Sequence, residues 1–301
     1  MSEKAEGAGE AVGFPPAARA IQQARALRVA AAALMLLPGA AITLSLIAAC
    51  LILLRFSFNH WDAVRSMTPG WTLENYAALP AIPSVLRAFV TTLRISAIVT
   101  AICIVVGYPV ALGIARSRHR ALLTFLLVSP MLMDVLIRAY GWIIMLGQRG
   151  IVNATLVGLG VLDEPKRFVF TETAVVLELI HELIPFMVLP IAAVIERIDP
   201  VYAEAAMNLR AGPVRTFLHV TLPMSVPGVF AGTLLTFALA MSAFVAPLLL
   251  GGGNVQTITM LMRQSMLTTL NWPFGSAESV ALVVLVLALL VVQGRIIRGL
   301  G

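Results

Sequence analysis

Three ionisable side chains are concentrated in one otherwise apolar segment, and their types and spacing could do chemistry. They belong to Glu178, His181 and Glu182. On a helix, spacings of three and four residues put these side chains on one face. Two carboxylates there could replace the water around an amine, so the face is a candidate to line a path for a cationic solute. The alternative is that the acids pair with Arg94 or Arg138 and hold neighbouring helices together.

A metal site is not predicted. His181-Glu182 begins like the HExxH motif of zinc proteases, but Pro185 occupies the position of the second histidine. Proline supplies no ligand and breaks a helix, so the motif is incomplete. The two cysteines, Cys50 and Cys103, lie in apolar runs without a CxxC pattern, and we expect them to behave as small apolar residues.

The composition of the chain is that of a membrane protein. Of its 301 residues 59% are hydrophobic and 12% are charged, and the mean hydropathy is +0.94. A soluble domain has about a quarter charged residues, so the lipid bilayer must surround most of this chain. In such a protein the net charge of +6 relates to orientation in the membrane, and we expect no nucleic-acid partner.

The apolar runs predict an all-α membrane protein with about six transmembrane helices. The predicted spans are residues 28–54, 86–115, 121–146, 173–195, 225–250 and 279–297. Prolines 109, 130, 185 and 190 are expected to interrupt the second, third and fourth spans. Residues 1–27 form a polar tail, and residues 28–301 form the membrane domain.

The distribution of basic residues predicts the orientation. If both ends of the chain lie on one side of the membrane, that side holds more Lys and Arg than the other. The positive-inside rule then places both termini, and the tail, in the cytoplasm. A multi-pass protein of a bacterial inner membrane is the expected result.

Other polar residues in the predicted spans are assigned individually. Asp134 and Arg138 lie four residues apart, a spacing that favours an internal ion pair. Arg94 needs a partner that the sequence does not name. Ser242 and Phe244 are further candidates for the path, because a hydroxyl can accept a hydrogen bond from an amine and an aromatic ring attracts a cation. Packing is the commoner role of such residues.

Residues 197–228, here called the bracket, separate the fourth and fifth predicted spans. Asp199 is a good N-cap for a short helix that starts at Pro200. Gly212-Pro213 predicts a turn into a second short helix, which we expect to end at Leu222-Pro223. A compact pair of helices with small exposed residues is suited to docking another protein; the alternative is an amphipathic loop on lipid headgroups.

The bracket resembles the EAA loop of the permeases of bacterial ATP-binding-cassette (ABC) importers. The matching positions are Glu204-Ala205-Ala206, Ala211, Phe217, Leu222-Pro223 and Pro227-Gly228. Arg210 occupies the position of the family's glycine, and we expect Gly212 to take over the turn. The resemblance implies a type I importer permease fold in which this loop is a cytoplasmic coupling helix that docks on an ATPase. The residues implied in docking are Glu204, Ala205, Ala206, Arg210, Ala211, Gly212, Phe217, Leu222 and Pro223.

Further stretches are similar to one branch of this family. TLENYAAL, GYPVAL, LIRAYGW, the triple glycine at 251–253 and NWPFGSA resemble permeases that import spermidine and putrescine. The resemblance implies a polyamine cargo, a second permease subunit, two ATP-binding subunits and a periplasmic substrate-binding protein. Related branches carry opines, aminophosphonates or ferric iron, so these solutes are alternatives.

The chain is not predicted to hydrolyse ATP. A P-loop needs a glycine-rich turn followed by Lys and then Ser or Thr, whereas the two lysines, Lys4 and Lys166, precede Ala5 and Arg167. We therefore expect no cofactor in this chain, with ATP and Mg²⁺ bound by partner subunits. A membrane enzyme is the less favoured alternative, because no nucleophile–base set or metal-ligand set is recognisable. An ion channel would leave the EAA pattern unexplained.

Overall fold

The computed structural model describes residues 37–62 and 66–298, and the predicted tail, residues 1–27, lies outside them. Within these ranges, six helices are long and apolar enough to cross a membrane, as predicted. They are Leu37–Phe56, Pro83–Arg116, Val135–Gly158, Glu172–Ile195, Pro213–Ser242 and Trp272–Arg295. The chain divides into two units, Met1–Arg55 and Phe56–Gly301. All features described below belong to the second unit.

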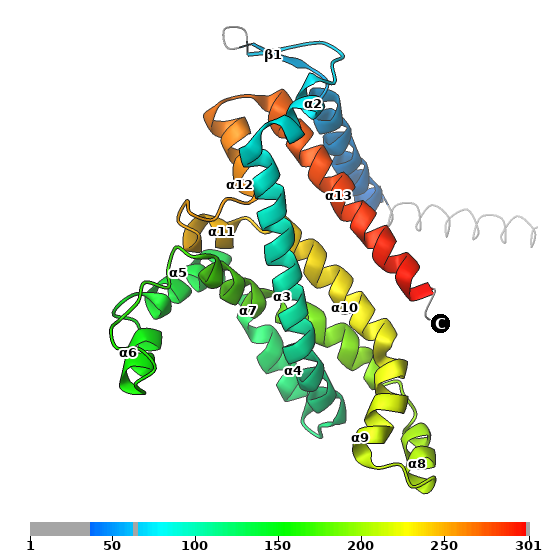
Figure 1. Ribbon diagram of the computed structural model, residues 1–301. Helices are drawn as coiled ribbons and strands as arrows, with labels where there is room; N and C mark the ends of the chain where they lie inside the picture. Colours follow the sequence, from blue (N-terminus) through cyan, green and yellow to red (C-terminus); the bar gives the residue numbers. More distant parts are fainter. Residues whose placement is uncertain (1–36, 63–65, 299–301) are drawn as a thin grey trace, which may run out of the picture. The chain divides into compact units, whose positions relative to one another are not determined.

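Three long helices form the centre of the second unit. They are α3 (Pro83–Arg116), α7 (Glu172–Ile195) and α10 (Leu222–Ser242), and each packs against the other two (Figure 1). Pro83 occupies the first turn of α3, where its missing N–H is not needed. The Thr171 hydroxyl caps α7 by accepting a hydrogen bond from the Ala174 N–H at 3.3 Å.

Small residues allow α7 and α10 to approach closely. A Cβ atom added at Gly228 would lie 2.8 Å from the carbonyl oxygen of Pro190, and one at Gly232 would lie 2.8 Å from that of Met187. Helices in a membrane associate through such close packing, because lipid is as apolar as the side chains. Tyr108 on α3 adds a hydrogen bond of 2.7 Å to the Ser225 hydroxyl on α10.

Several predicted helix boundaries were wrong. The helices α3 and α7 continue through Pro109, Pro185 and Pro190 without a break. The predicted span 121–146 is instead divided near Pro130 into α4 (Arg120–Val128), a 3₁₀ turn η1 (Ser129–Leu132) and α5 (Val135–Leu146). The third membrane helix combines α5 with α6 (Ile151–Gly158).

The fifth span begins and ends earlier than predicted. It starts at α9 (Pro213–Thr216), passes through a π-helical turn η2 (Phe217–Thr221) and continues as α10 without a break at Leu222-Pro223. It ends at Ser242 because Ala243 adopts an extended conformation, with φ −60° and ψ 133°. The short helix α11 (Val245–Leu250) follows as a separate element.

Different elements occupy the two ends of α3. Near its first residues lie α2 (Glu74–Ala81), α12 (Ile258–Arg263), the π-helical turn η3 (Gln264–Thr268) and α13 (Trp272–Arg298). A small antiparallel hairpin, β1 (His60–Asp62) and β2 (Ser66–Thr68), pairs Trp61 with Met67. The helices α8 (Pro200–Asn208) and α9 lie near the last residues of α3, at the other end of the unit (Figure 1).

Candidate functional site

One arginine connects two of the three acidic residues of α7, Glu178 and Glu182. The Nε atom of Arg138, on α5, lies 3.2 Å from Oε1 of Glu178, and its Nη2 atom lies 2.9 Å from Oε1 of Glu182. Arg138 is 7% exposed and Glu178 is fully buried, whereas the Glu182 side chain is 32% exposed. Two carboxylates therefore share one guanidinium group, and Glu182 is the one that reaches a surface.

The predicted ion pair between Asp134 and Arg138 is wrong. Asp134 directly precedes α5, and its carboxylate accepts a hydrogen bond of 2.8 Å from the Leu136 N–H. An aspartate in this position satisfies an N–H group that has no partner within the helix. Because Asp134 acts as the cap, Arg138 is left to pair with Glu178 and Glu182 on the neighbouring helix.

His181 also connects α5 with α7. The indole Nε1 of Trp142 donates a hydrogen bond of 3.3 Å to His181 Nδ1, and the two rings meet edge to face at 5.8 Å between centroids. His181 therefore packs against α5 beside the charged cluster. Its predicted place on the same face of α7 as the two glutamates is consistent with these contacts.

A cavity of about 260 Å³ brings together three of the five residues predicted to line the path. Glu182, Ser242 and Phe244 all line it, among side chains from α5, α7, α10 and α11. Glu178 and His181 are not among its lining residues. We call this cavity the Glu182 pocket.

The end of α10 positions Ser242 and Phe244 in the Glu182 pocket. The Ser242 hydroxyl donates back to carbonyl oxygens of its own helix, at 3.2 Å from Ala238 and 3.0 Å from Leu239. The chain then turns at Ala243, whose carbonyl oxygen accepts a 2.8 Å hydrogen bond from the Thr259 hydroxyl. A hydroxyl has acceptor capacity left while it donates, so Ser242 can still receive a hydrogen bond.

The bracket contains two short helices joined by a turn at Arg210. Asp199 caps α8 through a 2.9 Å hydrogen bond from the Val201 N–H, as the sequence predicts. Arg210 itself adopts a left-handed backbone conformation with φ +61°. Gly212 has φ −67° and directly precedes α9, so the expectation that Gly212 takes over the turn is wrong.

The turn is closed by backbone hydrogen bonds that follow α8. The Arg210 N–H donates to Met207 O at 2.9 Å, and the Ala211 N–H donates to Ala206 O at 3.1 Å. A left-handed residue at this position is a common helix ending, and it is usually glycine. Arginine there has a backbone cost of about 1–2 kcal/mol.

The outer side of the bracket is exposed and partly apolar. Leu209 is 85% exposed and Val214 is 69% exposed, and Glu204 and Ala205, which precede them along the chain, are exposed as well. Phe217 faces inward instead, and its ring meets that of Tyr108 edge to face at 5.7 Å. Exposed apolar side chains next to polar ones are typical of a surface that another molecule covers.

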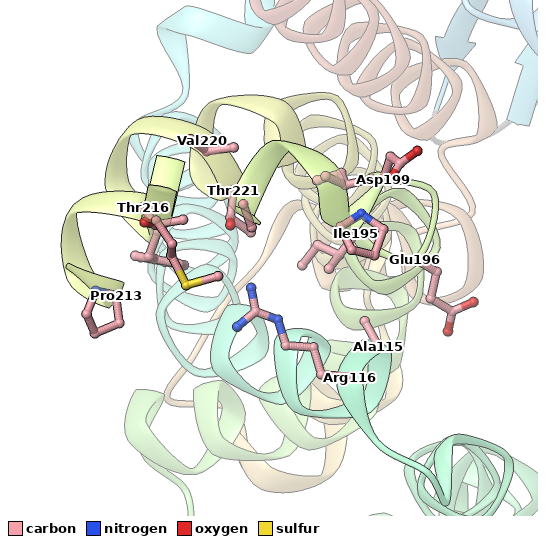
Figure 2. A pocket seen from close by; sticks show the side chains of 14 residues that line it. Ala115, Arg116, Ile195, Glu196, Asp199, Pro213, Thr216, Val220 and Thr221 are labelled. Atoms are coloured by element: carbon pink, nitrogen blue, oxygen red, sulfur yellow. The ribbon is translucent and has the colours of Figure 1, made fainter. Parts of the chain in front are cut away.

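A second cavity, of about 430 Å³, separates the bracket from the ends of α3 and α7. Its lining includes Arg116, Glu196, Asp199 and Phe217. Figure 2 shows the Arg116 side chain extending from α3 into the space that the bracket encloses. The bracket is therefore attached to the bundle along its η2 side, while a cavity lies beneath α8 and α9.

Arg94, for which the sequence named no partner, forms an ion pair with Glu172 at the start of α7. Both residues line a cavity of about 320 Å³ that also includes Arg87, Asn254 and Gln256. Asn254 donates a hydrogen bond of 3.1 Å to Phe170 O. Because Arg94 and Glu172 lie 78 positions apart in the chain, no local spacing could have indicated this pair.

Comparison with known proteins places this arrangement in a family. Residues 104–300 match the family of binding-protein-dependent transport system inner membrane components. The chain is 38% identical over 247 residues to the spermidine/putrescine transport system permease protein PotB of Haemophilus influenzae, covering 81% of this chain and 86% of that protein. It is 36% identical over 250 residues to the protein of the same name from Escherichia coli K12, covering 82% and 90%.

The fold is also found in a solved transporter. A chain in the crystal structure of a bacterial alginate ABC transporter, in complex with a periplasmic protein bound to an alginate pentasaccharide, superposes with a TM-score of 0.76. The match covers 94% of this chain and 97% of that chain at 19% identity. Six helices among its described residues are long and apolar enough to cross a membrane. This chain belongs to the family of binding-protein-dependent transport system inner membrane components, and is a permease subunit with the fold of ABC importers.

Proposed function

We propose that the solute carried by this permease is a polyamine, spermidine or putrescine, and that it moves from the periplasm to the cytoplasm. The observation that carries the proposal is the identity of 36–38% to two permeases named for these solutes, over more than 80% of this chain. The Glu182 pocket supplies physical support, because the described residues that line it include one carboxylate and no basic residue.

The Glu182 pocket has the groups that an alkylammonium ion needs. Glu182 supplies a negative charge, Ser242 a hydrogen-bond acceptor and Phe244 an aromatic face that attracts a cation. Leu183 and Phe186 add apolar surface for the methylene groups. In the proposed path, Glu182 contacts the solute while Arg138 and Glu178 hold it in position, and His181 fixes the distance between α5 and α7.

The bracket is proposed to dock on an ATP-binding subunit in the cytoplasm. Glu204, Ala205 and Ala206 on α8 and the turn at Arg210, Ala211 and Gly212 would form the contact surface. Phe217, Leu222 and Pro223 would transmit the movement into the membrane. Basic residues at this end of the bundle, among them Arg116 on α3 and Arg215 on α9, favour a cytoplasmic position for it under the positive-inside rule. The proposal has both termini in the cytoplasm as well.

One continuous helical rod joins the proposed docking surface to the Glu182 pocket. The rod Pro213–Ser242 has 30 residues, so at 1.5 Å per residue it extends over about 45 Å. Its first residues belong to the bracket and its last residue lines the Glu182 pocket. A displacement of the bracket by nucleotide-driven closure would therefore move Ser242 directly, which is the coupling that alternating access requires.

The proposed assembly contains four further components. They are a second permease subunit, two ATP-binding subunits that hold ATP and Mg²⁺, and a periplasmic substrate-binding protein. In this proposed assembly the permease chain performs no catalysis and holds no cofactor of its own. The alternative cargoes are opines, aminophosphonates and ferric iron, and the pocket with its single exposed carboxylate suits an amine better than the anionic alternatives.

Uptake into cells tests the cargo. A strain without polyamine importers would express all subunits of this transporter and be given radiolabelled putrescine or spermidine. We expect saturable, ATP-dependent uptake that unlabelled polyamine competes away and an opine does not. Uptake of an opine or of ferric iron in place of polyamine, with the complex present in the membrane, would refute the proposed cargo and leave the permease family intact.

A further inference from the structure

Glu278, on α13, is a buried acid beside a cavity. Glu278 is 1% exposed, and its Oε2 atom has no hydrogen-bond partner in the part of the chain that the structure describes. Glu278 lines a cavity of about 320 Å³, here called the Glu278 pocket. Among the described residues that line this pocket there is no Lys, Arg or His. A buried carboxylate without a positive partner is costly, so a group that supplies one would bind here favourably.

The walls of the Glu278 pocket combine hydrogen-bond acceptors with apolar surface. Gln256, Gln264 and Ser265 contribute side-chain oxygens, and Ser265 lies beside the Glu278 carboxyl group. Val85 and Phe274 contribute apolar walls. The two glutamines are exposed whereas Glu278 is buried, so the acid lies in the interior and the amides lie nearer the surface.

The local backbone positions Gln264, Ser265 and Glu278 around the cavity. Gln264 and Ser265 belong to the π-helical turn η3, and such turns occur frequently at functional sites. The turn ends where the Asn271 N–H donates to Ser265 O at 2.8 Å, and the Asn271 side chain then caps α13 at the Phe274 N–H at 3.0 Å. Glu278 therefore lies about one and a half turns into α13, facing the turn that precedes the helix.

We propose that the Glu278 pocket binds a primary alkylammonium group, with Glu278 as its counterion. A divalent metal ion would need more carboxylates, and no group of metal-ligating side chains is present among the described residues. An alkylammonium ion matches the lining better, because its head can donate three hydrogen bonds and its carbon chain can contact the apolar walls. The volume is at the lower end of that of small-molecule sites.

The Glu278 pocket is separate from the proposed path. It is built from the first residues of α3 with α12, η3 and α13, and it shares no lining residue with the Glu182 pocket. The inference therefore does not depend on the cargo of the transporter. The ammonium group has two chemical sources, a soluble amine or the ethanolamine headgroup of a membrane lipid, and the two are separable by experiment.

Binding of radiolabelled n-butylammonium to the assembled transporter tests the proposal. The complex would be placed in nanodiscs of phosphatidylcholine and phosphatidylglycerol, which contain no primary amine. Because the Glu182 pocket is itself proposed to bind an amine, every complex in this test carries Glu182→Gln. In that background we expect one saturable site per copy of this chain, lost when Glu278→Gln is added. Unchanged binding after Glu278→Gln is added, or no saturable binding in the Glu182→Gln background, would overturn the proposal.

A second variant guards against a folding defect. Ser265→Leu leaves the Glu278 carboxylate in place but fills the pocket with an apolar side chain, so it should also abolish binding while the complex still elutes as one assembly. Binding that survives Ser265→Leu would contradict the location of the site.

Phosphatidylethanolamine in the nanodiscs distinguishes the two sources. If the natural ligand is the lipid headgroup, this lipid should raise the apparent Kd of n-butylammonium in the Glu182→Gln background at least tenfold. If the ligand is a soluble amine, the lipid should leave the Kd unchanged. Both results support an ammonium site at Glu278.

Discussion

Arg138 on α5 and Glu182 on α7 are joined by a contact of 2.9 Å at the border of the Glu182 pocket. The same guanidinium group contacts the fully buried Glu178 at 3.2 Å. Glu178 and Glu182 lie one helical turn apart, and their environments give them different roles. Glu178 belongs to the packing between two helices, whereas Glu182 has an exposed portion that a solute can reach.

The variant Glu182→Gln should impair transport without impairing assembly. A hydrogen bond to a charged group is worth about 1.5–3 kcal/mol, so we expect uptake at low solute concentration to fall at least about tenfold. The measurement is the initial rate of putrescine uptake at equal amounts of complex in the membrane. Glu196→Gln is the control, because Glu196 lines the other cavity. Equal uptake by Glu182→Gln and the wild type would remove Glu182 from the path.

Removing Arg138 should destabilise the protein. The variant Arg138→Leu leaves Glu178 buried without a positive partner, and breaking a buried ion pair in this way costs about 3–5 kcal/mol. We expect a large drop in the amount of folded complex recovered from the membrane. The double variant Arg138→Leu with Glu178→Leu removes both charges and should restore much of the yield. A double variant as unstable as the single one would contradict the account of this pair.

Replacing Arg210 with glycine should stabilise the turn. Arg210 has φ +61°, and glycine adopts that conformation without the cost of a Cβ atom. We expect Arg210→Gly to stabilise the complex by about 1 kcal/mol, seen as a higher midpoint of thermal unfolding.

Gly212→Ala is the matched control for this variant. Gly212 has φ −67°, and a Cβ atom there would meet nothing within 4 Å, so the substitution should leave the midpoint almost unchanged. Stabilisation by Gly212→Ala and destabilisation by Arg210→Gly would reverse the assignment of the turn.

The close approach of α7 and α10 should depend on Gly232. A Cβ atom there would lie 2.8 Å from the Met187 carbonyl oxygen and from the Met187 sulfur, so Gly232→Ala must push the helices apart. We expect a loss of about 1–3 kcal/mol, typical of overpacking, measured as reduced thermal stability. Gly113→Ala, on α3 with nothing within 4 Å of the added atom, should be tolerated. Equal stability of the two variants would argue against tight packing at Gly232.

The sequence predicted the features that depend on local patterns. Six apolar runs predicted the six candidate spans of the described residues, because the length and composition of a run are local properties. Asp199-Pro200 predicted the start of α8, because a helix cap acts within a few residues. The alternative in which Glu178 and Glu182 pair with Arg138 is confirmed. Local spacing could not decide between this pairing and one with Asp134, because Glu178 lies 40 positions from Arg138 in the chain. One signal was available: Asp134 follows a proline-containing break and precedes an apolar run, which favours a cap over an ion pair.

The remaining differences between the predicted and the observed helix boundaries follow from tertiary packing. Proline in α3 and α7 is accommodated within continuous helices, so the prolines alone could not locate the breaks. Helix α10 ends at Ser242, where the Thr259 hydroxyl donates a hydrogen bond to Ala243 O. Local sequence periodicity could not predict this contact, because the two residues belong to different segments. The predicted sixth span begins at residue 279, and the burial of Glu278 follows only from the extension of α13 back to Trp272.

The most direct test of the proposed function is the ATPase activity of the purified complex in lipid. The rate would be measured with empty binding protein and with binding protein loaded with spermidine, putrescine or an opine. We predict stimulation by the polyamine-loaded protein alone, and we predict that Glu204→Ala, on the exposed face of α8, abolishes the stimulation while the complex stays assembled. Stimulation by the opine-loaded protein without any response to polyamines would contradict the proposed cargo, and full stimulation of Glu204→Ala would contradict the proposed docking surface.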